Sequence, residues 1–93
     1  MFILSQDRDT IFTLQDKGLF KGHLYAEDIE IDGHYYGTNI YGTTLFKTYF
    51  LGTYEEGEAE QVIAEIYRLL KAGEKYYSMP VPSLDLEDMG VSL

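Results

Sequence analysis

Residues 28–41 read DIEIDGHYYGTNIY and carry the clearest structural signal in the sequence. The first four residues alternate polar and apolar side chains, as a half-buried β-strand requires. Asp32-Gly33 follows, and this pair is a strong hairpin signal because a type I′ turn needs a positive φ at both central residues. The stretch therefore predicts a β-hairpin whose return strand covers residues 34–41.

The next segments extend this hairpin into a meander. Gly42-Thr43 predicts a second turn, and Thr44–Leu51 is rich in aromatic and β-branched residues, which predicts a further strand. Nearer the N-terminus, Phe2–Leu4 and Thr10–Leu14 predict two shorter strands that pair with each other.

Residues 15–22 contain Gly18 and Gly22 and predict a loop between the early strands and the hairpin. The apolar pair Leu19-Phe20 lies between the two glycines. We expect this loop to fold both side chains back onto the body of the protein.

The hydrophobic period changes after residue 52 and predicts one helix over residues 55–72. Thr53 and Glu56 have the spacing of a capping box, and Gly73 is suited to end the helix. The apolar stripe predicts the buried face, with Ala59, Val62, Ile63, Ile66 and Leu70 at helical spacing.

The predicted fold class is therefore α+β: an antiparallel meander of about five strands packed against one C-terminal amphipathic α-helix. Residues 1–82 are predicted to form a single domain. Residues 83–93 follow a segment with two prolines and are predicted to be an acidic–hydrophobic C-terminal tail.

Charge and composition restrict the class of function. The 93 residues include sixteen acidic and seven basic side chains, a net charge of −9, which disfavours direct binding to nucleic acid. The favoured interpretation of this charge is solubility, and the second is binding to a basic protein surface. The apolar run after Met1 is too short for a signal peptide or a membrane span, so we expect a cytoplasmic protein with no membrane partner.

The residues that carry catalysis or bind metals are sparse. The chain has no cysteine, its two histidines are His23 and His34, and it has no HxxxH spacing, G-x-S-x-G elbow or phosphate-binding loop. We expect no catalytic residue, no metal site and no cofactor, and hence no enzyme.

Alternation along the return strand assigns its tyrosines to two faces. Tyr36 shares a face with His34, whereas Tyr35 shares the opposite face with Tyr41. One face covers the helix, and the other would display aromatic side chains to solvent, which a monomer avoids. A homo-oligomer interface is the favoured explanation, followed by coverage by the N-terminal strands or the tail, and then by an open ligand surface.

Three motifs carry a resemblance to a known set of proteins: FILSQDRDTIFTL at residues 2–14, LGTYEE at 51–56 and YYSMP at 76–80. They resemble small proteins of Gram-positive bacteria, their phages and other mobile elements. The resemblance implies a β-meander closed by one helix and supplies no catalytic residue, and residues 17–27 depart from its pattern. It also implies an inhibitor of a host system such as antiviral defence.

The predicted function is therefore a non-enzymatic phage or mobile-element protein that inhibits a host antiviral-defence component through an acidic, tyrosine-rich surface. Its expected partner is a host protein with a basic surface. The candidate binding residues are Asp28, Glu30, His34, Tyr35, Tyr36, Tyr41, Lys47, Tyr49, Glu55 and Glu56.

Two alternatives stay open. The first is an oligomeric sponge for a nucleotide-like signalling molecule, with a base stacked on tyrosines and phosphate bound by basic residues. The second is an accessory protein whose helix docks on a partner. The sponge would use Tyr35, Tyr41 and Tyr49 for the base and Arg8, Lys21 or Lys47 for phosphate.

Overall fold

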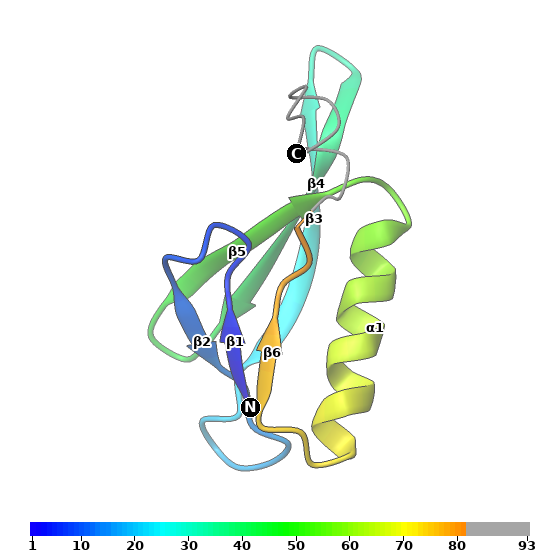
Figure 1. The fold of residues 1–93 in the computed structure, drawn as a ribbon. Coiled ribbons are helices and arrows are strands. Elements are labelled where there is room, and N and C mark those ends of the chain that lie inside the picture. The colour runs from blue at the N-terminus through cyan, green and yellow to red at the C-terminus, as the bar shows by residue number, and fades with distance from the viewer. Residues whose placement is uncertain (82–93) are drawn as a thin grey trace.

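The computed structural model describes residues 1–81 and contains six strands and one helix within them (Figure 1). The α+β class is confirmed. The predicted tail at residues 83–93 lies outside the described residues. The elements in chain order are β1 (Phe2–Leu4), β2 (Ile11–Thr13), β3 (His23–Ile31), β4 (His34–Thr43), β5 (Thr48–Tyr54), α1 (Glu58–Lys71) and β6 (Tyr76–Ser78).

The strands form two three-stranded sheets, in the orders β3-β4-β5 and β2-β1-β6, and not the single meander that was predicted. The larger sheet is the antiparallel meander built on the predicted hairpin. Asp32 has φ 52° and Gly33 has φ 80°, so both central turn residues adopt the positive φ that a type I′ turn requires.

The turn between β4 and β5 lies at residues 44–47, which corrects the predicted turn at Gly42-Thr43. Gly42 is part of β4 because its lack of a side chain admits Phe12: a Cβ at this position would lie 2.7 Å from the Phe12 ring. The Thr44 hydroxyl accepts hydrogen bonds from the backbone N–H groups of Phe46 and Lys47, and thereby closes the actual turn.

The smaller sheet joins the two ends of the described chain. β1 and β2 pair antiparallel as predicted, whereas β6 pairs with β1 in parallel, with Phe2 opposite Tyr76. No strand was predicted at residues 76–78. Their strand state depends on a partner more than 70 positions away in the chain, so local sequence carries little signal for it.

The helix begins at Glu58, three residues later than predicted, and the predicted capping box is wrong. Thr53 lies within β5, where its hydroxyl donates to Asn39 Oδ1 at 2.6 Å. The predicted end is confirmed: Gly73 has φ 87°, and the N–H groups of Gly73 and Glu74 donate to the carbonyls of Leu70 and Leu69. This pattern is a Schellman motif.

The helix is also not the last element, since β6 follows it. The helix and the smaller sheet lie side by side over one face of the larger sheet, and the core fills the space between them (Figure 1). The predicted helix stripe is buried at Ala59, Val62, Ile66 and Leu70. These side chains meet Ile3, Phe12, Ile40, Leu51 and Met79 in one cluster.

The loop at residues 15–22 corrects another expectation, because Leu19 and Phe20 are 80% and 56% exposed. Gly22, with φ 70°, lies against the Phe12 ring and the Thr43 carbonyl, so Phe12 already fills the inner position. Phe20 instead stacks on Phe46 at the surface, with ring centroids 6.3 Å apart.

Candidate binding surface

The hairpin of β3 and β4 projects beyond the rest of the larger sheet. Its pairing runs to Ile31 opposite His34, whereas β5 stops pairing with β4 at Thr38. Residues 29–37 therefore form a two-stranded projection, which extends past the N-terminal end of α1 in Figure 1. The side chains of His34, Tyr35 and Tyr36 are exposed on it.

A β-bulge interrupts the alternation of β4 within this projection. Ile29 pairs with Gly37 and Glu30 pairs with Tyr35, which leaves Tyr36 as the extra residue. Gly37 has φ 146°, a conformation that a residue with a side chain rarely adopts. The bulge moves Tyr35 onto the face of Thr38, so the predicted face shared by Tyr35 and Tyr41 is wrong.

Tyr35 is held in place by a short hydrogen-bonded chain. The Thr38 hydroxyl, in a side chain only 5% exposed, donates to Asp28 Oδ1 at 2.8 Å. Its single proton is used there, so the Tyr35 hydroxyl must donate to Thr38 Oγ1, at 2.6 Å. The chain orders the tyrosine ring on the inner side of the hairpin beside a carboxylate.

An acidic cleft of about 270 Å³ lies where the base of the hairpin meets the start of α1. The small residues Ala26, Gly57 and Ala59 leave this space open, and the carboxylates of Asp28, Glu56 and Glu60 line it together with Thr38. The positive end of the helix dipole favours carboxylates at this place. The cleft is suited to receive a cationic group such as a lysine or arginine side chain.

The structure thus brings together Asp28, Glu30, Tyr35, Glu55 and Glu56, with His34 and Tyr36 at the hairpin tip. We call this region the hairpin end, comprising residues 28–37 and 55–60.

Three predicted site residues lie elsewhere. Tyr41 is on the outer face of the larger sheet, stacked on Tyr25 with ring centroids 5.3 Å apart. Tyr49 packs on Phe12, and the Lys47 ammonium lies 5.0 Å from the centre of the Tyr49 ring. A single base therefore could not stack on Tyr35, Tyr41 and Tyr49 together.

The sequence missed an aromatic row on the outer face of the larger sheet. Tyr25 lies opposite Tyr41, which lies opposite Phe50, and the three rings form a continuous row. Tyr25 was overlooked because the predicted strand began at Asp28, whereas β3 begins at His23. Phe50 lay within the predicted strand at residues 44–51, but that strand began four residues too early, so the pairing of Phe50 with Tyr41 was not predicted.

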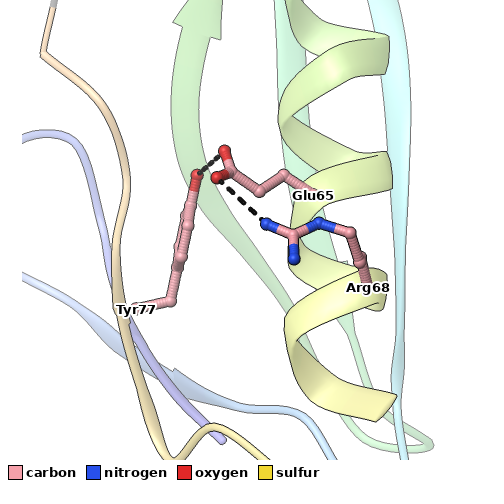
Figure 2. A network of polar contacts seen from close by, with 3 residues as sticks. All are labelled: Glu65, Arg68 and Tyr77. Carbon is pink, nitrogen blue, oxygen red and sulfur yellow. Dashed lines mark hydrogen bonds and ion pairs between the residues drawn. The ribbon is translucent and has the colours of Figure 1, made fainter. Parts of the chain in front are cut away.

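The two tyrosines with shifted pKa values are not exposed on the projecting hairpin: Tyr54 is buried and Tyr77 is half-buried. Burial, followed by the negative charge of Glu65, raises the pKa of Tyr77 to about 12. Its hydroxyl donates to Glu65 Oε2 at 3.4 Å, and Arg68 lies 3.8 Å from the other carboxylate oxygen (Figure 2). Burial also raises the pKa of Tyr54, whose hydroxyl donates to the Pro80 carbonyl at 2.6 Å. Both phenols stay neutral and join β6 to the rest of the fold.

Within residues 1–81, no group of three histidine or carboxylate side chains is placed to hold a metal ion. No helix in this part of the chain has the length and apolar character needed to cross a membrane. The expectations of no cofactor and no enzymatic activity stay predictions. No protein-family model, curated protein or solved structure matches the chain.

Proposed function

We propose that this chain is a non-enzymatic binding protein whose hairpin end occupies a basic groove on a partner protein. The observation that carries the proposal is the projecting hairpin, which presents exposed tyrosines and carboxylates on a narrow two-stranded ribbon beside an acidic cleft.

Charge at the hairpin end is of one sign. The chain has no lysine or arginine from residue 22 to residue 46, or from residue 48 to residue 67. The hairpin end lies within these two segments and carries Asp28, Glu30, Asp32, Glu55, Glu56, Glu58 and Glu60. A field of this kind raises the rate of association with a basic surface and favours the correct orientation.

Two tyrosines supply the apolar contact that charge alone does not give. Tyr35 is held by Thr38 before any partner arrives, so little side-chain entropy is lost on binding. Tyr36, at the bulge, is 62% exposed. Tyrosine side chains of this kind are frequent binding hot spots because a large ring carries a polar tip.

The resemblance to proteins of phages and mobile elements supports a host protein as the partner. We propose that the partner is a host protein, such as a component of antiviral defence, and that the basic groove normally holds nucleic acid. The acidic ribbon would compete with the phosphate backbone for the same lysines and arginines.

The test is affinity purification from host cells with the wild-type chain and with Glu30→Lys as bait. We expect a partner that is retained by the wild type, is lost with Glu30→Lys and is released as salt rises. Glu74→Lys is the matched control, because Glu74 is exposed beyond the C-terminal end of α1. The purified partner should then lose bound nucleic acid when the wild type is added.

Equal retention by the wild type and Glu30→Lys would contradict the proposal. Salt-insensitive binding would also contradict it, since exposed ion pairs are screened by salt.

The nucleotide-sponge alternative is favoured by a different feature, a second cleft of about 270 Å³ between the loops at residues 18–22 and 43–45. Phe20, Lys21 and His23 line this cleft, so an aromatic ring, an ammonium group and an imidazole are available to a base and its phosphate. Native mass spectrometry of the wild type and Lys21→Ala with defined nucleotides would test this alternative. No adduct with either protein would count against it.

A further inference from the structure

The aromatic row on the outer face of the larger sheet remains exposed within residues 1–81. Tyr25 is 37% exposed and Phe50 is 45% exposed, and Tyr41 lies between them with ring centroids 5.3 Å and 5.9 Å away. The row is braced from one side: Thr53 donates to Asn39 Oδ1, and Asn39 Nδ2 donates to the Tyr41 hydroxyl at 3.1 Å. The surface is therefore ordered before any contact forms.

This outer face is also the least acidic part of a strongly acidic molecule. All residues of β3, β4 and β5 are described, and among those that face outward Glu27 is the one carboxylate, with no lysine or arginine. Charge depletion and enrichment in tyrosine and phenylalanine are typical of the centre of a protein interface. Two copies with a net charge of −9 each repel one another least across this face.

We infer that the outer face is the interface of a homodimer, in which two copies pack face to face with their β3 strands antiparallel. His23 and Glu27 lie two residues on either side of Tyr25, so all three side chains share the outer face. The twofold axis runs along the row of Tyr25 and Tyr41, between the two sheets and perpendicular to the strands. It places Glu27 of one copy opposite the partner's His23. Because the interface is isologous, this contact occurs twice.

The same orientation gives charge complementarity beyond the centre. The loops at the beginning of β3 and β5 carry Lys17, Lys21 and Lys47 against one carboxylate, Asp16, whereas the turn at the other end of β3 carries Asp32 and no basic residue. Ile31 lies six residues from Tyr25, about 20 Å along the strand. In the antiparallel dimer the turn at Asp32 of each copy therefore reaches the basic loops of its partner.

A parallel arrangement lacks these contacts. With its twofold axis along β3, it would place Glu27 opposite the partner's Glu27, and it would bring the two acidic hairpins to the same end of the dimer, where like charges repel. The antiparallel arrangement also sends the two hairpin ends in opposite directions. The inferred dimer does not depend on the proposed function, because it uses the outer face of the larger sheet, whereas Tyr35 and the acidic cleft lie on the inner side.

The test is a charge exchange measured by sedimentation equilibrium on the full chain. In the His23→Glu homodimer, carboxylate faces carboxylate at both contacts. In the Glu27→Lys homodimer, an ammonium group replaces the carboxylate that faces the partner's His23. We expect each variant to dimerise about tenfold more weakly than the wild type. An equimolar mixture pairs Glu at position 23 with Lys at position 27, so we expect heterodimers that are at least as strong as the wild-type dimer.

Phe50→Asp tests the aromatic centre, and we expect it to be monomeric. Tyr76→Asp is the matched control, because Tyr76 is 74% exposed on β6 of the other sheet and should leave the dimer intact. Circular dichroism establishes that each variant is folded. The charge exchange touches no core residue and decides the question even if Phe50→Asp does not fold.

A wild-type chain that stays monomeric would overturn the inference and would assign the outer face to a different protein or to another segment of this chain. A dimer that Phe50→Asp leaves unchanged would also overturn it. A mixture of His23→Glu and Glu27→Lys that associates no better than either variant alone would overturn the antiparallel arrangement.

Discussion

The side-chain amide of Gln6 pairs with the backbone of Thr53 in both directions. Gln6 Nε2 donates to the Thr53 carbonyl at 3.1 Å, and the Thr53 N–H donates to Gln6 Oε1 at 2.9 Å. The Gln6 backbone N–H adds a bond to the Leu51 carbonyl at 2.7 Å. Gln6 thus acts as a short added strand along the edge of β5 and joins the β1–β2 turn to the larger sheet.

Gln6→Ala should lower the free energy of unfolding by about 2 kcal/mol, because it leaves the partly buried N–H and C=O groups of Thr53 without their partner. Urea denaturation measures the change. Gln61→Ala, at an exposed position on α1, is the control and should change the free energy of unfolding by less than about 0.5 kcal/mol. Equal stability of the two variants would show that water replaces the Gln6 amide without loss.

The contact between Gly42 and Phe12 should be intolerant of a single methyl group. Gly42→Ala would place a Cβ 2.7 Å from the Phe12 ring, and we expect a loss of about 1–3 kcal/mol. The smaller Phe12→Leu side chain relieves the clash, so the double variant should lose less than the sum of the two single losses. Additive losses would mean that Gly42 is required for backbone freedom and not for the close approach of Phe12.

The sequence predicted features whose cause is local. The hairpin at Asp32-Gly33 follows from the φ values that its turn requires, and the end of α1 follows from Gly73. The helix stripe follows from its period. Each of these signals lies within a few residues of the feature that it specifies.

The features that the sequence did not predict depend on contacts between distant segments. Gly42 was predicted to be a turn residue, whereas its actual role depends on the Phe12 ring that lies against it. Strand β6 requires β1, and the later start of α1 follows from Thr53 being part of β5. The bulge at Tyr36 reverses one face of the hairpin, and strict alternation cannot reveal it.

For the candidate site, the sequence located the acidic residues and the tyrosines but did not establish which of them share a surface. The cleft beside Asp28 forms only when α1 begins at Glu58, because Gly57 then lines it. The aromatic row required the register of three strands, which residue spacing alone does not fix.

The Thr38 hydroxyl should contribute measurable stability to the hairpin. Thr38→Val keeps the shape of the side chain but removes the donor to Asp28 and the acceptor for Tyr35, so we expect a loss of about 1–2 kcal/mol. Thr38→Ser keeps the hydroxyl and loses one methyl group, and serves as the control. In a double-mutant cycle, Tyr35→Phe should cost less in the Thr38→Val background than in the wild type. Identical costs would mean that the two hydroxyls are not coupled.

The Tyr77 phenol should make the protein less stable in alkali. An unfolded Tyr77 loses its proton near the usual tyrosine pKa of 10, whereas burial and Glu65 raise the pKa of the folded side chain to about 12. Between these values the unfolded state binds fewer protons, so the free energy of unfolding falls as pH rises. Tyr77→Phe removes this effect. Relative to the wild type, we expect its free energy of unfolding to gain on the order of 1 kcal/mol between about pH 9 and about pH 11, a figure reduced for the solvent that screens this partly exposed ring.

Glu65→Gln removes the negative charge but keeps a hydrogen-bond acceptor, and should reproduce a smaller part of the gain. Urea denaturation at the two pH values measures both, with Tyr76→Phe on the same strand as the matched control. A stability difference between wild type and Tyr77→Phe that does not change with pH would contradict a raised pKa for Tyr77.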